Sequence, residues 1–181
     1  MNPEISFLNG IQEHLQSPGM DIFFKYYTHL GEAVVFIALA VLLIIFKKTR
    51  KIGVTVLLAL TLGTLIGNLI LKNVFARPRP YNDANALIGV ADLLIKKPSD
   101  YSFPSGHTLA GFNTALVVFY YKKIPGAFAL LAAALLAFSR MYLYVHYPTD
   151  IIGGFILAVL CSVSAFYMAK AVFKKQELAG R

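Results

Sequence analysis

The sequence predicts an all-α protein, a polytopic bundle of membrane helices. Of its 181 residues, 57% are hydrophobic and only 14% are charged, and the mean hydropathy is +0.64. A soluble domain carries about a quarter charged residues, and disorder is excluded because this much apolar material has to be buried. The third observation is a series of apolar runs, each close to the roughly 20 residues that a spanning helix needs.

The N-terminal segment, residues 1–20, is expected to form an amphipathic helix that lies in the membrane interface. Its apolar residues recur at helical spacing among polar ones, and they are Ile5, Leu8, Ile11 and Leu15. A signal peptide is excluded because the segment contains no uninterrupted apolar stretch. A Ser-Pro-Gly sequence at residues 17–19 then ends the helix.

Five apolar stretches follow, and each is expected to cross the membrane. They comprise residues 26–46, 52–71, 104–121, 124–139 and 151–169. Glu32 is the only acidic residue within them. No repeat, low-complexity segment or linker divides the chain. Residues 21–170 are therefore expected to form one transmembrane domain, followed by a basic cytoplasmic tail of residues 171–181.

Positively charged residues orient the predicted spans. Clusters follow the first, third and fifth spans, and they contain Lys47, Lys48, Arg50, Lys51, Lys122, Lys123, Lys170, Lys174, Lys175 and Arg181. With five spans, one side holds these ten cations and one Glu, whereas the other holds seven cations and eight acids. The positive-inside rule makes the basic side cytoplasmic. We expect a multi-pass protein of the plasma (inner) membrane with an external N-terminus and a cytoplasmic C-terminus.

The net charge of +8 does not indicate a nucleic-acid partner. Its cations lie in clusters at helix ends, whereas nucleic-acid binding needs them on one recognition face. The single cysteine, Cys161, lies in an apolar run, so a disulfide framework and a thiolate metal site are both excluded.

A second set of polar residues remains, at the external ends of the predicted spans. It comprises Lys72, Arg79, Ser105, Gly106, His107, Ser139, Arg140, His146 and Asp150. Polar and ionisable groups near a bilayer interior are costly and usually functional. Arg77 lies in the same region, and we interpret it as an interfacial anchor whose charge reaches water. The set predicts one site on the external membrane face.

The residue types in this set match a tetrahedral oxyanion such as phosphate. Arginine forks and a lysine charge engage phosphate oxygens, and free amides at a helix start, as at Ser105-Gly106, add to an anion site. A metal ion is not expected, because only Asp150 accompanies the histidines and the neighbouring cations would repel it.

Two histidines and one aspartate add reactive groups to this site. His146 and Asp150 are four residues apart, a spacing that would bring them near each other at a helix start. A carboxylate can hold an imidazole in one tautomer, and an oriented neutral imidazole can attack phosphorus and form a phosphohistidine. His107 can then protonate the leaving oxygen as general acid.

In residue type, order and spacing, three stretches resemble the signature of the type 2 phosphatidic acid phosphatase (PAP2) superfamily. They are Lys72-x6-Arg79-Pro80, Pro104-Ser105-Gly106-His107 and Ser139-Arg140-x5-His146-x3-Asp150. The similar architecture covers roughly residues 20–170, although the family core is usually described with six helices rather than five spans.

The resemblance implies a lipid phosphatase that needs no metal or other cofactor. By this resemblance His146 is the nucleophile, Asp150 its partner and His107 the general acid. The same resemblance implies which residues hold the phosphate: Lys72, Arg79, Ser105, Gly106, Ser139 and Arg140.

The implied substrate is a membrane lipid phosphate or diphosphate. In size and orientation the chain most resembles bacterial undecaprenyl-diphosphate phosphatases, which regenerate the carrier lipid for cell-wall synthesis. Phosphatidylglycerophosphate, phosphatidic acid and lipid A are alternatives, because the motif residues would contact the phosphate and not the lipid tail. A catalytically silent lipid-binding or translocating protein is an alternative of another class, against which the retained His107, His146 and Asp150 argue. The membrane spans argue against haloperoxidase chemistry with bound vanadate.

Two hypotheses concern charges outside the signature. Glu32 either pairs with a site cation such as Arg140 or Lys72, or lies exposed to water near the helix end. Lys96 and Lys97, in the loop before the third span, either attract a second phosphate or anionic head group or are solvated charges.

Overall fold

The computed structural model describes residues 2–89 and 92–179, and within them every regular element is a helix. The α-helices are α1 (Pro3–Leu15), α2 (Pro18–Tyr27), α3 (Ala33–Ile45), α4 (Arg50–Gly63), α5 (Lys72–Phe75), α6 (Gly106–Tyr121), α7 (Lys123–Tyr142) and α8 (Pro148–Ala179). A 3₁₀ turn, Thr28–Gly31, joins α2 to α3, and a π-helix, Thr64–Leu71, joins α4 to α5. The expected all-α class is confirmed. Side chains are described as far as Lys174, so those of Lys175 and Arg181 in the predicted basic tail lie outside the described part.

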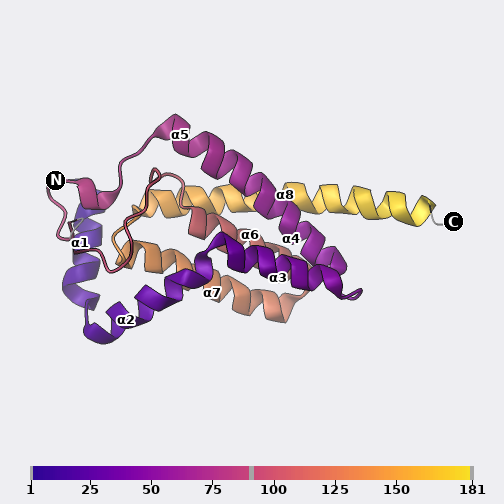
Figure 1. Cartoon of the computed structure of the whole chain (residues 1–181), viewed down its shortest axis with the longest axis horizontal. Coiled ribbons are helices and arrows are strands. Elements are labelled where there is room, and N and C mark those ends of the chain that lie inside the picture. Colours follow the sequence, from indigo (N-terminus) through magenta and orange to yellow (C-terminus); the bar gives the residue numbers. More distant parts are fainter. Residues whose placement is uncertain (1, 90–91, 180–181) are drawn as a thin grey trace.

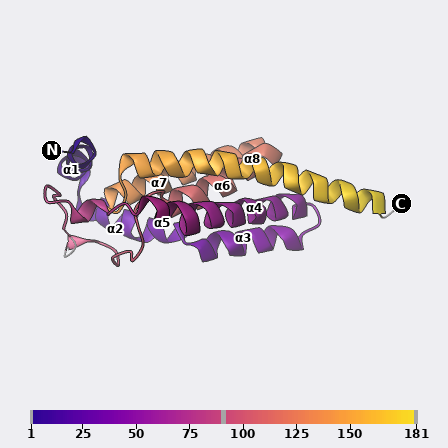
Figure 2. The same cartoon turned by 90° about the horizontal axis from the view of Figure 1, so that it is seen from above.

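Helices α3, α4, α6, α7 and α8 run along the long axis of the molecule and form the bundle (Figures 1 and 2). Helix α6 is central, because it packs against α3, α4, α7 and α8. It buries Leu109 and Val117, whereas the surrounding helices expose large apolar side chains such as Val34, Leu131 and Leu160. A large apolar exterior marks a surface that contacts lipid. The chain is therefore a multi-pass membrane protein.

Three segments of the described chain are each long and apolar enough to cross a membrane. They are Arg50–Asn82, Lys123–Tyr142 and Pro148–Lys174, and they correspond to three of the five expected spans. The first expected span is bent by 52° between Pro18–Gly31 and Ala33–Ile45. The bend lies at Glu32, whose extended backbone separates the 3₁₀ turn from α3. The expected first span is thus two helices rather than one straight rod.

Helix α6 begins two residues later than expected and has 16 residues, fewer than the roughly 20 of a full span. Ser105 is its N-cap: the backbone of Ser105 is extended and its hydroxyl accepts from the amide of Thr108. Ser and Thr are preferred at this position because their oxygen satisfies an amide that has no partner in the helix. The cap starts the helix inside the bundle, next to the other polar residues of the signature.

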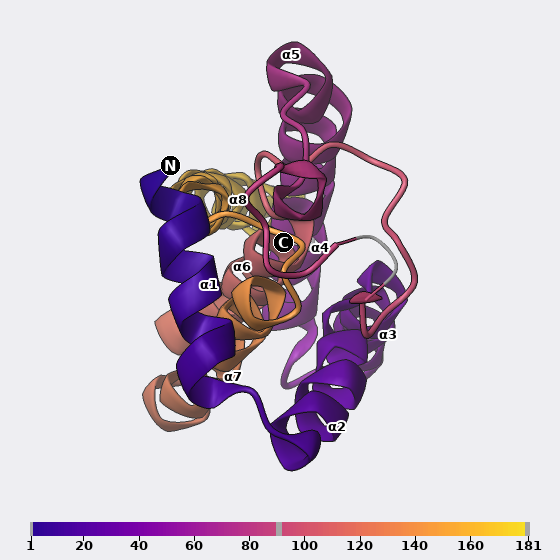
Figure 3. The same cartoon turned by 90° about the vertical axis from the view of Figure 1, so that its left-hand side faces the viewer.

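Helix α1 crosses one end of the bundle, which faces the viewer in Figure 3. Its apolar residues Ile5 and Leu8 are fully buried, in the same cluster as Tyr142, Leu143 and Val145 of the α7–α8 connection. Most of the apolar face predicted to enter the membrane interface is therefore covered by protein, whereas Leu15 at the end of the helix is exposed. We call this end of the bundle the site end.

The π-helix Thr64–Leu71 lies directly before Lys72. A Cβ atom at Gly67 in this π-helix would lie 2.6 Å from Leu109 Cδ2 of α6 and 3.2 Å from Leu157 Cδ2 of α8, so a larger residue here would displace these leucine side chains. Helices of the π type are rare and occur frequently at functional sites, since the wider turn changes the angular position of the residues that follow. Here the residue that follows is a buried lysine.

Candidate active site

The signature residues come together around a cavity of about 410 Å³ at the site end. The cavity is lined by six of them: Lys72, Arg79, Gly106, His107, Arg140 and His146. Asp150 lies behind His146, and the hydroxyls of Ser105 and Ser139 are turned to other partners. The residues come from α5, the loop between α5 and α6, α6, α7 and the α7–α8 connection. Segments far apart in the sequence therefore build one polar site.

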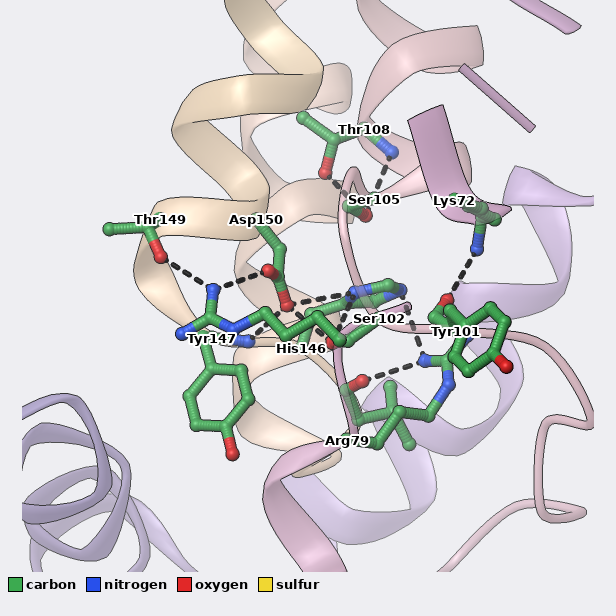
Figure 4. A network of polar contacts seen from close by, with 12 residues as sticks. Lys72, Arg79, Tyr101, Ser102, Ser105, Thr108, His146, Tyr147, Thr149 and Asp150 are labelled. Carbon is green, nitrogen blue, oxygen red and sulfur yellow. Dashed lines mark hydrogen bonds and ion pairs between the residues drawn. The ribbon is translucent and has the colours of Figure 1, made fainter. Parts of the chain in front are cut away.

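His146 and Asp150 form the expected pair. His146 Nδ1 is 3.4 Å from Asp150 Oδ2, and His146 Nε2 is 3.2 Å from Arg79 Nη1 (Figure 4). A guanidinium group can only donate, so Nε2 accepts and the proton of a neutral imidazole is on Nδ1, toward the carboxylate. The lone pair of Nε2 therefore faces the cations of the site.

The surroundings of His146 favour its neutral form. Burial of the imidazole and then the positive charges of Arg79 and Arg140 hold the pKa of His146 well below its ordinary value of 6.5. Neutral imidazole is the nucleophilic form. The His146 imidazole thus needs no deprotonation at neutral pH.

Ser102 also contacts the His146–Asp150 pair, and the sequence pattern does not indicate it. Its hydroxyl donates to Asp150 Oδ2 at 2.5 Å and lies 3.4 Å from His146 Nδ1. The backbone amide of Tyr147 donates to the same Oδ2 at 2.8 Å. These donors hold the carboxylate beside the imidazole. A loop serine carries no specific sequence signal beyond its place three residues before Ser105.

Lys72 and Arg79 are joined by Asp100, which the sequence pattern also does not indicate. Asp100 Oδ2 lies 2.5 Å from Lys72 Nζ, and Asp100 Oδ1 lies 2.6 Å from Arg79 Nη2. Burial raises the pKa of Asp100, but the hydrogen bonds and charges of Lys72 and Arg79 outweigh it and lower the pKa to about 2. An ionised carboxylate therefore occupies donors that the sequence assigns to phosphate.

Arg140 reaches the cavity from the last turn of α7 and is 4% exposed. Its Nη1 donates to Thr28 Oγ1 of the 3₁₀ turn at 2.5 Å. Its Nε is buried and, among the described residues, has no hydrogen-bond partner. A buried donor without a partner is costly, and an anion in the cavity would satisfy it. This orphaned donor supports an oxyanion site.

The signature serines make local hydrogen bonds. Ser105 Oγ accepts from Thr108 as the N-cap of α6, and Ser139 Oγ donates to the carbonyl of Leu136 at 2.6 Å. Between these helices, Gly106 faces Asn68: a Cβ there would lie 3.1 Å from Asn68 Oδ1. The first amides of α6, at Gly106 and His107, have no acceptor within their own helix, and both residues line the cavity.

The charges outside the signature also have definite places. Glu32 lies 2.6 Å from His29 Nδ1 with its side chain half exposed, so the hypothesis of a pair with Arg140 or Lys72 is wrong and the water-exposed alternative holds. Glu32 lies at the bend and is one of the residues that line the cavity. Lys96 is exposed and lines the same cavity, whereas Lys97 Nζ lies 5.9 Å from the centre of the Tyr81 ring.

The chain is similar to known proteins in sequence and in fold. A profile described as the PAP2 superfamily matches residues 34–174. An undecaprenyl-diphosphatase from Sulfolobus acidocaldarius is 36% identical over 155 residues, which are 85% of this chain and 67% of that protein. The crystal structure of LpxE from Aquifex aeolicus superposes with a TM-score of 0.76 at 30% identity and covers 90% of this chain and 94% of that one. The structure of a transmembrane PAP2-type phosphatidylglycerolphosphate phosphatase from Bacillus subtilis superposes with a TM-score of 0.68 at 27% identity, with 97% and 88% covered.

Proposed function

Because the chain belongs to the PAP2 superfamily of membrane lipid phosphatases, we propose that it hydrolyses a lipid diphosphate through a phosphohistidine on His146. The observation that carries this proposal is the orientation of His146. Its Nδ1 faces Asp150, its Nε2 faces Arg79, and the residue lines the cavity together with Lys72 and Arg140. This is the arrangement that nucleophilic catalysis by an imidazole needs.

The proposed reaction has two steps. In the first, His146 Nε2 attacks phosphorus, a P–N bond forms, and the bond to the leaving oxygen breaks as His107 donates a proton to that oxygen. In the second, water attacks phosphorus, the P–N bond breaks, and His107 takes a proton from the water. We assign Arg79, Arg140 and the first amides of α6 to stabilise the negative charge that develops on the phosphoryl oxygens. Such electrostatic stabilisation usually makes the largest contribution to the rate enhancement. No step calls for a metal.

The walls of the cavity support a membrane-resident substrate. Its polar end is formed by the signature residues, and its walls also include the apolar side chains of Ala33 and Ile37 of α3, Leu60 of α4 and Ala110 of α6. A diphosphate head group fits the cations, and an apolar chain fits the space beside α3 and α4. We propose undecaprenyl diphosphate first, in keeping with the name of the Sulfolobus relative.

We further propose that the site opens on the extracytoplasmic side. The α3–α4 and α6–α7 connections, which carry Lys47–Lys51 and Lys122–Lys123, lie at the other end of the bundle from α1 (Figure 1). Lys51 Nζ lies 5.3 Å from the centre of the Phe173 ring, so the distal part of α8 also belongs to that basic end. By the positive-inside rule the basic end is cytoplasmic, and residues 171–181 are its tail.

A panel of lipid phosphates tests the proposed substrate. Purified protein in detergent with EDTA is expected to release phosphate, with the highest kcat/KM for undecaprenyl diphosphate. Phosphatidylglycerophosphate, phosphatidic acid and lipid A are the alternative substrates, and each is measured at the same mole fraction in the micelle. A higher kcat/KM for one of these would assign the chain to that substrate instead, and dependence on added metal would contradict the mechanism.

Asp100→Asn is expected to strengthen inhibition by inorganic phosphate, lowering its inhibition constant about 10-fold, because the carboxylate competes with phosphate for Lys72 and Arg79. The pKa of Asp100 is about 2, below its ordinary 3.8, so the ion pairs stabilise the fold above pH 3.8 and this contribution is lost as pH falls through about 2. The competing charge is therefore present throughout the neutral range.

The control for this measurement is Asp92→Asn, which removes an exposed acid from the same loop. Its inhibition constant is expected to equal that of the wild type. An unchanged or higher constant in Asp100→Asn would show that the carboxylate holds Lys72 and Arg79 for phosphate rather than competing with it.

A further inference from the structure

Arg77 makes contacts that an interfacial anchor does not need. Its Nη1 donates to Asp150 Oδ1 at 2.6 Å and to Thr149 Oγ1 at 2.7 Å, and its Nη2 donates to Glu4 Oε2 at 2.5 Å. The guanidinium carbon lies 3.9 Å from the centre of the Tyr147 ring. One planar group thus joins α1 to the carboxylate beside His146 and stacks on the α7–α8 connection.

The two oxygens of Asp150 have different partners. Oδ2 faces His146 and accepts from Ser102 and the amide of Tyr147, whereas Oδ1 is held by Arg77. The Asp150 side chain is fully buried, so loss of Arg77 would leave a buried carboxylate oxygen without its cationic partner. The contact of Arg77 with Oδ1 therefore controls how the carboxylate is turned toward the imidazole.

Glu4 of α1 holds the other side of Arg77. Its Oε1 accepts from the backbone amide of Thr149 at 3.0 Å and from its hydroxyl at 2.8 Å, while Oε2 pairs with Arg77. Burial raises the pKa of Glu4, but hydrogen bonds from Thr149 and Arg77 outweigh it and leave the pKa below its ordinary value. The ionised Glu4 thus fixes both Arg77 and the first turn of α8.

The placement of Glu4 depends on how α1 docks. Asn2 caps the helix by accepting from the amide of Glu4, and Ile5 and Leu8 are fully buried beside it. One helical turn further on, Gln12 donates to the carbonyl of Tyr142 at 2.5 Å. The helix is therefore anchored to the site end by residues that follow Glu4, and its first turn is fixed by the Asn2 cap.

We propose that Glu4 and Arg77 are positioning residues for the phosphatase reaction, through which the N-terminal helix α1 sets the orientation of Asp150 and thereby of His146. This inference rests on the proposed function. Neither residue lines the cavity that contains His146, although Arg77 lines a second cavity together with Lys72 and Arg79. Their ion pair and the contact of Arg77 with Asp150 therefore place them to act on the orientation of His146. A lysine cannot replace Arg77, because a single ammonium cannot bridge two carboxylates in one plane and stack on an aromatic ring.

The test compares Glu4→Gln, Arg77→Lys and Arg77→Gln with the wild type in single-turnover reactions with radiolabelled undecaprenyl diphosphate. The rate constant of phosphohistidine formation is expected to fall about 10-fold in Glu4→Gln and about 100-fold in both Arg77 variants, the range found when a partner that orients a reactive side chain is lost. KM is expected to stay within about twofold of the wild type. Glu4→Gln should have no further effect in the Arg77→Gln background, because the two act in series.

The rate constant separates positioning from folding. A smaller fraction of folded protein lowers the amplitude of the single turnover but leaves its rate constant unchanged. Glu13→Gln makes the same chemical change at an exposed position of α1 and is expected to keep the wild-type rate constant. Wild-type rate constants in Glu4→Gln and Arg77→Lys, or an equal loss in Glu13→Gln, would overturn the positioning role while leaving the proposed function intact. A wild-type chain that releases no phosphate from any lipid of the panel would overturn both.

Discussion

His146→Ala is expected to abolish phosphate release in the presence of EDTA, with kcat lower by about 10⁴-fold or more. The variant removes the nitrogen that we propose forms the P–N bond, while Arg79, Arg140 and Lys72 remain to bind phosphate. Substrate binding should therefore persist, and KM should change little. Acid-labile histidine phosphate, measured after a rapid quench with labelled substrate, should disappear together with turnover.

The matched control for this variant is His14→Ala, which removes an exposed histidine from α1. It is expected to keep full activity and the labelled phosphoenzyme. Turnover by His146→Ala above about one per cent of the wild type would assign the nucleophile to another group, since loss of a covalent nucleophile costs far more than that.

Arg140→Lys is expected to lower kcat/KM by about 10² to 10³-fold. The substitution keeps the positive charge but removes the planar fork and with it the buried Nε that has no hydrogen-bond partner among the described residues. If the fork serves the phosphoryl group in the transition state, kcat should fall more than KM rises. Steady-state kinetics on undecaprenyl diphosphate measure both constants.

Arg50→Lys is the control, because Arg50 is an exposed arginine at the basic end of the bundle. It is expected to leave both constants unchanged. If Arg140→Lys keeps the wild-type kcat/KM, the site needs only a positive charge at this position. The buried Nε without a partner would then have no role in binding phosphate.

The fold class and most of the cavity could be predicted from the sequence because each is encoded locally. An apolar run near the length of a bilayer predicts a helix by itself, and a signature such as Pro104-Ser105-Gly106-His107 marks a helix start through its N-cap. Polar residues at the same ends of such helices then have to share one membrane face. That reasoning predicts that Lys72, Arg79, His107 and His146 lie together, and all four line the cavity.

The bend at Glu32 and the π-helix before Lys72 could not be predicted in the same way. Hydropathy measures how apolar a run is, and both segments are apolar whether they are straight or not. The bend follows from how Thr28 and Gly31 contact Arg140 and His107, and the π-helix from the close approach of Gly67 to α6 and α8. Both are decided by packing between distant segments.

The sequence by itself determined an all-α membrane bundle, its family and six of the residues that line the cavity, because helix length, charge clusters and motif spacing are properties of neighbouring residues. Only the tertiary structure decided the role of residues that act across the chain. Asp100 joins Lys72 to Arg79. Arg77 joins Glu4 to Asp150, and each of these two partners is 73 residues away from Arg77 in the sequence. An ion pair of this kind depends on where the backbone carries each charge, so no local pattern could distinguish Arg77 from an anchor at the membrane interface.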